Sequence, residues 1–121
     1  MILLDYQDRR PLYEQISEKF RTLIISGALP PGEKMPSVRQ LAMDLSINPN
    51  TIQRAYMELE QQGLIYPVKG RGNFVTDNPH IQQISRMDYL KELSELLRKG
   101  KELVISSEEV RRLVEEHFKE E

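Results

Sequence analysis

Apolar residues recur at helical spacing in three segments of the first half of the chain. The first segment follows Pro11, which suits the first position of a helix because its nitrogen carries no hydrogen that would lack a partner there. Gly27 is a typical helix stop, and residues 28–36, rich in proline and glycine, indicate a loop that is neither regular helix nor central strand. The segments predict three helices with inward stripes at Leu12, Ile16, Phe20, Leu23 and Ile24; at Val38, Leu41, Ala42 and Leu45; and at Ile52, Ala55, Tyr56 and Leu59.

Polar residues stand where the second and third helices would begin. Ser37 can cap the second helix, and Gln40 three residues later allows a reciprocal capping box. Residues 46–48 are the predicted turn, and Asn48 can cap a third helix that has Pro49 at its first position. The order of short helix, tight turn and helix predicts a helix-turn-helix, whose last helix enters the major groove of DNA with its N-terminal end.

A short β-hairpin is predicted directly after the third helix, which Gly63 ends. Residues 64–66 and 73–76 are rich in residues that favour strands, and they flank a flexible, positively charged tip at 69–72. The predicted fold class is therefore mainly α with a small β-hairpin (α+β). We expect a winged helix-turn-helix domain at residues 1–77.

The tail, residues 78–121, is predicted to form two further helices that cannot hide their apolar faces alone. The first runs from about 80 to 99 and stops at Gly100; the second begins just after Ser106, which forms a second capping-box signal with Glu109. Leucines at 3–4 spacing are typical of a seam between paired helices, although packing back on the first domain is the alternative. Because residues 1–77 supply their own core, we expect a two-helix C-terminal dimerisation segment with an interface at Leu90, Leu93, Leu97, Val110, Leu113, Val114 and Phe118.

The composition limits the classes of protein to which the chain can belong. Its 121 residues are 39% apolar and include no cysteine, which excludes disulfides and thiolate metal sites and fits an intracellular, cytoplasmic location. No apolar run approaches the length of about 18 residues that a membrane span needs, so no membrane partner is expected.

The net charge of −2 argues weakly against a nucleic-acid-binding protein, but the distribution of charge argues for one. From Asp77 to the end, 8 basic residues stand against 11 acidic ones. DNA binding depends on the charge presented to phosphates, so the local excess of base matters more than the total. Residues 37–56 and 67–74 have Asp44 as their only acid and carry four basic residues, Arg39, Arg54, Lys69 and Arg71.

The outward residues of these elements have chemistry that suits a DNA duplex. Arg39 lies in the first turn of the second helix, where a cation opposes the helix dipole at a cost of about a few tenths of a kcal/mol, which a phosphate ligand would justify. Lys69 and Arg71 lie on a thin loop of the kind that enters a minor groove. Small polar groups at the start of the third helix can touch base edges and phosphates, although an ordinary solvated face is the alternative for each; these groups are Asn48, Asn50, Thr51, Gln53 and Arg54.

No catalytic or metal-binding constellation is recognisable. His80 and His117 are 37 residues apart without a matched acidic cluster, and Glu58 and Glu60 do not share a helix face. Serine and threonine occur without a nearby candidate base. We therefore expect no enzyme, no metal and no other cofactor.

Four motifs resemble the GntR family of bacterial transcription regulators: LYEQI at 12–16, GALPPGEKMPSVRQLA at 27–42, NTIQRAYMELE at 50–60 and GRGNFV at 70–75. A tail of two helices in place of a large effector domain resembles the YtrA subfamily. The resemblance implies a cytoplasmic, nucleoid-associated homodimer on a palindromic operator, usually a repressor. Members of this subfamily often govern operons for ABC-type transporters. The resemblance carries over no ligand-binding residues, so whether a small-molecule effector binds is left open.

The resemblance also implies roles for individual residues. The family's phosphate and base contacts carry over to Arg39, Asn50, Thr51 and Gly70. Where many relatives have an arginine that reads guanine, this chain has Gln53, and a glutamine suits adenine better. The expected DNA-binding residues are Ser37, Arg39, Asn48, Asn50, Thr51, Gln53, Arg54, Lys69, Gly70 and Arg71.

Two other functions stay open at this point. A winged helix can also bind a partner protein, and such a use favours apolar residues on the outward face of the third helix. Relatives also fuse a helix-turn-helix head to aminotransferase-like domains, which would make the chain part of an enzyme. The polar outward positions and the basic hairpin favour DNA over both.

Overall fold

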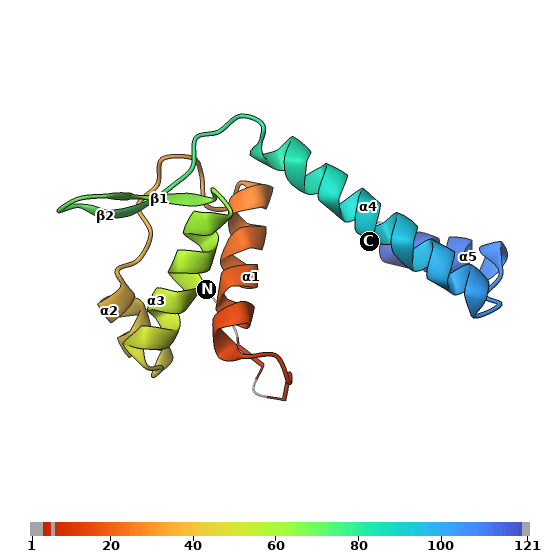
Figure 1. Cartoon of the computed structure of the whole chain (residues 1–121), viewed down its shortest axis with the longest axis horizontal. Coiled ribbons are helices and arrows are strands. Elements are labelled where there is room, and N and C mark those ends of the chain that lie inside the picture. Colours follow the sequence, from red (N-terminus) through yellow and green to blue (C-terminus); the bar gives the residue numbers. More distant parts are fainter. Residues whose placement is uncertain (1–3, 6, 120–121) are drawn as a thin grey trace. The chain divides into compact units, whose positions relative to one another are not determined.

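The computed structural model describes residues 4–5 and 7–119. They divide into two compact units, a first unit up to residue 82 and a second unit from residue 83 onward. No helix in the described part of the chain is long and apolar enough to cross a membrane. The elements, in chain order, are helices α1 (Leu12–Ser26), α2 (Val38–Leu45) and α3 (Pro49–Gln61), strands β1 (Ile65–Val68) and β2 (Gly72–Val75), and helices α4 (Ile81–Glu102) and α5 (Ser107–His117) (Figure 1).

The ends of α1 and α2 follow the predicted signals with two corrections. Pro11 is the N-cap of α1 and not its first helical residue, and Gly27 ends the helix in the left-handed conformation at φ 85°. The Gln40 backbone N–H donates to Ser37 Oγ (3.0 Å), as a cap requires. The reciprocal half of the predicted capping box is absent, because the Gln40 side chain donates instead to Asp44 Oδ1 (2.8 Å).

The turn between α2 and α3 forms as predicted. Ser46 turns the chain in the left-handed conformation at φ 55°. Asn48 caps α3 by accepting the Asn50 N–H at Oδ1 (2.9 Å), and Pro49 is the first helical residue. Three residues, 46–48, thus join the two helices.

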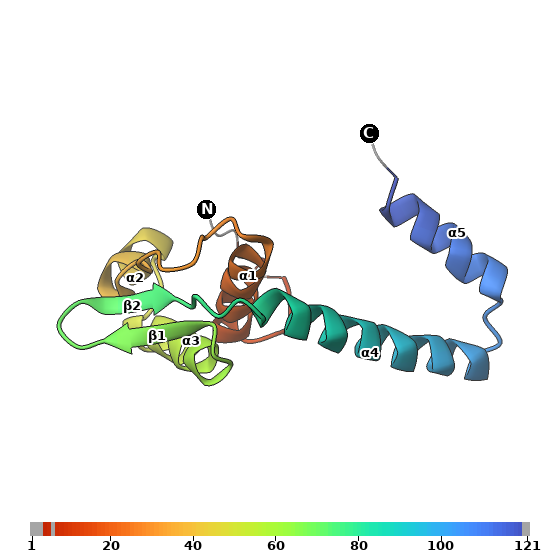
Figure 2. The ribbon, with the colours of Figure 1, turned by 90° about the horizontal axis from the view of Figure 1, so that it is seen from above.

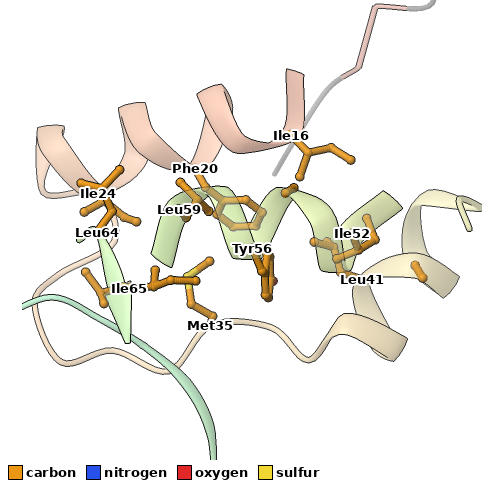
Figure 3. Packing of buried hydrophobic residues seen from close by; sticks show 13 residues of the cluster. Ile16, Phe20, Ile24, Met35, Leu41, Ile52, Tyr56, Leu59, Leu64 and Ile65 are labelled. Atoms are coloured by element: carbon orange, nitrogen blue, oxygen red, sulfur yellow. The ribbon is translucent and has the colours of Figure 1, made fainter. Parts of the chain in front are cut away.

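One hydrophobic core holds α1, α2, α3 and the hairpin together (Figure 3). All four predicted inward residues of α3 are buried, and α2 contributes Leu41 and Ala42. Tyr56 packs edge-on against Phe20, with ring centroids 5.8 Å apart. Its hydroxyl donates to Pro36 O (2.8 Å), so α3 also fixes the chain just before α2 begins.

The hairpin pairs β1 and β2 antiparallel, with Ile65 opposite Val75 and Val68 opposite Gly72. The prediction that residues 28–36 are only a loop is wrong in one respect. Lys34 forms a bridge with Phe74, and the Met35 N–H donates to Asn73 O (2.8 Å). The segment before α2 therefore lies along the free edge of β2.

The tail helices also differ from the prediction at one point. Helix α4 continues through Gly100 to Glu102, and the left-handed residue after it is Val104 at φ 60°. The Gly100 carbonyl accepts the Ile105 N–H (2.9 Å), which closes the turn. Helix α5 has the predicted capping box between Ser106 and Glu109 in both directions. Neither helix has a buried residue, as expected for faces that cannot be covered alone.

Candidate nucleic-acid interface

The start of α3 follows directly after α2, and the hairpin tip projects on the side of the first unit where α2 lies. Figures 1 and 2 both show the hairpin extending past α3 on the side of α2, with α1 on the other side. The start of α2, the start of α3 and the hairpin tip carry the predicted DNA-binding residues. All of them are exposed except Thr51, which is half-buried: Ser37, Arg39, Asn48, Asn50, Thr51, Gln53, Arg54, Lys69, Gly70 and Arg71.

The caps limit what two of these residues can offer to a ligand. Ser37 Oγ accepts the Gln40 N–H and Asn48 Oδ1 accepts the Asn50 N–H. The acceptor oxygens are thus engaged within the protein, while the Ser37 hydroxyl hydrogen and the Asn48 side-chain NH₂ are donors. Donors at a helix N-terminus suit phosphate oxygens.

Arg39 and Gln53 project from different helices. Arg39 lies in the first turn of α2, and Gln53 lies one turn into α3; both are exposed. The guanidinium of Arg39 is always charged, which suits a phosphate contact. The amide of Gln53 can form two hydrogen bonds at once, which suits a base contact.

Arg54 has a partner that the sequence did not reveal. Its guanidinium carbon lies 3.8 Å from the centroid of the Tyr13 ring on α1. Such a cation–π contact is worth about 0.5–1 kcal/mol at an exposed site and leaves the N–H edge of the guanidinium free to donate. Tyr13 therefore orients Arg54 from the α1 side. The two residues are 41 positions apart, and only the α1–α3 packing brings them together.

The hairpin tip is built around a tight turn. The Arg71 N–H donates to Val68 O (2.9 Å), and Gly70 adopts φ 77°, where a side chain would be strained. Lys69 and Arg71 flank this glycine and are exposed. The turn thus presents two cations on a narrow projection.

The predicted interface residues of the tail lie within the second unit. Leu90, Leu97, Leu113, Val114 and Phe118 are exposed, and Leu93 and Val110 are half-buried. Of the fifteen large apolar residues that are exposed in the described part of the chain, twelve lie in this unit. Exposed apolar surface on this scale is typical of a face that another protein covers.

The site has no sign of metal chemistry. In the described ranges, no three histidine or acidic side chains gather closely enough to hold a metal ion. The polar groups of the interface are amides, hydroxyls and permanent cations. They can bind and orient an anionic polymer.

Comparison with known proteins adds independent findings. Residues 12–75 match the family described as bacterial regulatory proteins, gntR family. The chain is 40% identical over 93 residues to the HTH-type transcriptional repressor YtrA of Bacillus subtilis (strain 168); the alignment covers 76% of this chain and 72% of the relative.

Solved structures agree in fold and family. A GntR family transcriptional regulator from Listeria monocytogenes is similar with a TM-score of 0.79 and 37% identity, over 93% of this chain and 98% of that one. The AraR DNA-binding domain in complex with operator ORR3 is similar with a TM-score of 0.54 and 32% identity, over 61% of this chain and 89% of that one. These likenesses and the family match confirm the predicted winged-helix fold class: the chain belongs to the GntR family of bacterial regulatory proteins and is a DNA-binding transcription regulator.

Proposed function

We propose that the protein is a homodimeric repressor that binds a palindromic operator in the bacterial cytoplasm. The observation that carries the proposal is the division of surfaces between the two units. The first unit presents cations and amides on α2, α3 and the hairpin, whereas the second presents apolar side chains that nothing in it buries. Residues 1–77 would bind DNA, and residues 78–121 would pair two chains.

The roles within the DNA-binding surface follow from side-chain chemistry. Helix α3 enters the major groove from Pro49 onward, and Asn50 and Gln53 reach base edges there. Arg39 and Thr51 hold phosphates and fix the register. The remaining members of the proposed surface are Ser37, Asn48, Arg54, Lys69, Gly70 and Arg71.

Pairing through α4 and α5 would remove leucine side chains from water. Leu90, Leu93 and Leu97 are spaced at i, i+3 and i+7, so they share one face of α4. Burying one such side chain is worth about 1.5–3 kcal/mol. A two-fold dimer would then address two half-sites about one helical turn apart, near 34 Å.

The regulated genes are proposed only by analogy. The relative from Bacillus subtilis is described as a repressor, and the YtrA-like motifs and short tail favour an operon for an ABC-type transporter. Selection of bound sites from random duplex DNA gives the half-site, the symmetry and the spacing. A selected site without two-fold symmetry would refute the palindromic operator.

Arg39→Ala tests the proposed phosphate contact. Losing one contact lowers the slope of log binding constant against log salt by about 0.9, with a similar loss of affinity on every sequence. Lys19→Ala, which removes an exposed cation from α1, is the control and should leave the slope unchanged. An unchanged slope for Arg39→Ala would contradict its role.

Leu90→Asp tests the pairing of chains. Leu90 is 59% exposed, so the change has little effect on the folding of one chain. The mass measured by light scattering should fall from dimer to monomer, because an interfacial carboxylate would be buried without a partner. Lys91→Asp, one residue away on another face of α4, should stay dimeric. Equal masses for wild type and Leu90→Asp would place the interface elsewhere.

A further inference from the structure

The segment before α2 pairs with β2 through a single antiparallel bridge. Its backbone N–H and C=O groups bond to β2 on both sides of Lys34: Gly32 N–H donates to Val75 O (2.9 Å) and Met35 N–H donates to Asn73 O (2.8 Å). Lys34 itself is bridged to Phe74. The position of Lys34 is therefore fixed by the same ladder that holds the hairpin.

Alternation of side chains at this bridge decides which way Lys34 faces. Neighbouring residues of a strand point to opposite faces. Met35 is 2% exposed and belongs to the core, so Lys34 faces outward. Glu33, the nearest acid in sequence, forms no ion pair within 4 Å among the residues that the structure describes.

Gly72 allows the Lys34 side chain to lie across the hairpin near its tip. A Cβ atom built on Gly72 would come within 3.2 Å of Lys34 Cε, which is closer than ordinary van der Waals contact. The apolar stem of the lysine thus lies directly over the Gly72 backbone. Its ammonium group is carried toward the tip, where Lys69 and Arg71 also lie.

Three cations at one tip repel one another unless an anion joins them. Both ion pairs within 4 Å in residues 4–5 and 7–119 are made by Arg10, so Lys34 is not neutralised by a carboxylate in that part of the chain. An exposed ammonium on a flexible stem is a point charge, which suits a phosphate oxygen and carries no base preference.

We infer that Lys34 is a further DNA-contacting residue, which binds a backbone phosphate beside the minor groove that Lys69 and Arg71 approach. The inference rests on the proposed function. It extends the DNA-binding surface from the hairpin tip to the bridged segment before α2, which the sequence indicated only as a loop.

Lys34→Met in the full chain is the test, because methionine keeps an apolar stem over Gly72 and removes the charge. Binding to a specific duplex and to a random duplex is measured by fluorescence anisotropy at several salt concentrations. We expect the salt slope to fall by about 0.9 on both duplexes, with roughly a three- to tenfold loss of affinity at 0.1 M salt. Lys34→Arg should restore the slope, and Lys19→Met on α1 should leave it unchanged.

Each outcome has one meaning. If wild type binds DNA in a salt-dependent manner and Lys34→Met has the same slope, the Lys34 contact is refuted and the proposed function stands. If wild type shows no salt-dependent binding to any duplex, the proposed function fails and the inference fails with it. A loss confined to one operator sequence would also refute the inference, because a phosphate contact acts on all sequences alike.

Discussion

The hydroxyl of Tyr56 links the centre of the core to the start of the DNA-binding surface. The side chain is 2% exposed, and its O–H donates to Pro36 O (2.8 Å) one residue before the cap of α2. Tyr56→Phe removes this hydrogen bond alone, since the edge-on ring contact with Phe20 is unaffected by the loss of the oxygen. We expect the variant to fold and to hold the start of α2 less firmly.

The size of the effect follows from the geometry. A neutral hydrogen bond to a backbone carbonyl contributes about 1 kcal/mol to stability. Pro36 is an exposed residue, so water can replace the lost donor and the penalty stays near that value. For a unit of this size, 1 kcal/mol lowers the melting temperature by roughly 4–8 °C.

Urea unfolding of wild type and variant, followed by circular dichroism, measures the loss. Tyr66→Phe is the matched control. Tyr66 is 39% exposed and stacks on Phe74, and its hydroxyl donates no hydrogen bond to another residue in the described part of the chain. Its free energy of unfolding should change by less than about 0.5 kcal/mol. Equal stabilities for Tyr56→Phe and Tyr66→Phe would refute the reasoning.

The same hydroxyl predicts a response to alkaline pH. Burial raises the pKa of Tyr56 above its ordinary value of about 10. The unfolded chain releases this proton near pH 10 while the folded chain keeps it. The contribution is therefore fully present below about pH 10 and is lost as pH rises toward the pKa of the folded state. Wild type should lose stability above pH 10 more steeply than Tyr56→Phe; parallel curves would show that Tyr56 ionises equally in both states.

Three further changes test the fold. Leu59→Ala, at a position with no exposed area, should lower the free energy of unfolding by about 2–5 kcal/mol in urea titrations. Asn48→Ala should cost about 1 kcal/mol by removing the cap of α3. A chain ending at residue 82 should melt higher than one ending at 78, because it keeps the packing of Ile81 and the bond from Gln82 Nε2 to Ile25 O (2.9 Å).

Specific results would contradict these expectations. A loss below about 1 kcal/mol for Leu59→Ala would mean that the core closes over the missing side chain. An unchanged stability of Asn48→Ala would mean that water replaces the cap. Equal melting temperatures for the two truncated chains would show that residues 79–82 add nothing to the first unit.

Local signals in the sequence predicted the helices of the first unit because their causes are local. Caps act on N–H groups two or three residues away, as Ser37 does on Gln40 and Asn48 does on Asn50. The inward stripe of α3 is set by the helical repeat. Such features need no knowledge of the partner that they pack against.

The contacts that the sequence-based prediction missed join distant segments. Lys34 pairs with Phe74, and Arg54 lies over Tyr13, each about 40 residues away. Neither helix-capping residues nor the spacing of apolar residues predicts these contacts, since they form only when the core brings the segments together. The prediction that the first tail helix ends at Gly100 was wrong for another reason. A glycine is compatible with a helix end but does not require one, and α4 continues through Gly100 at a cost of about 1 kcal/mol relative to alanine.

The net charge of −2 need not weaken binding to DNA, because charge acts locally in salt solution. At 0.1 M salt, screening limits interactions between exposed charges to about 10 Å. The charge that a phosphate meets is therefore set by the side chains near it and not by the total charge of the chain. Among residues 4–5 and 7–82, both ion pairs within 4 Å are made by Arg10, which is bound to Asp8 and Glu18 beside the start of α1 and lies outside the proposed DNA-binding surface. The cations that the surface needs are thus left for phosphates, and an acidic protein can bind DNA with a steep dependence on salt.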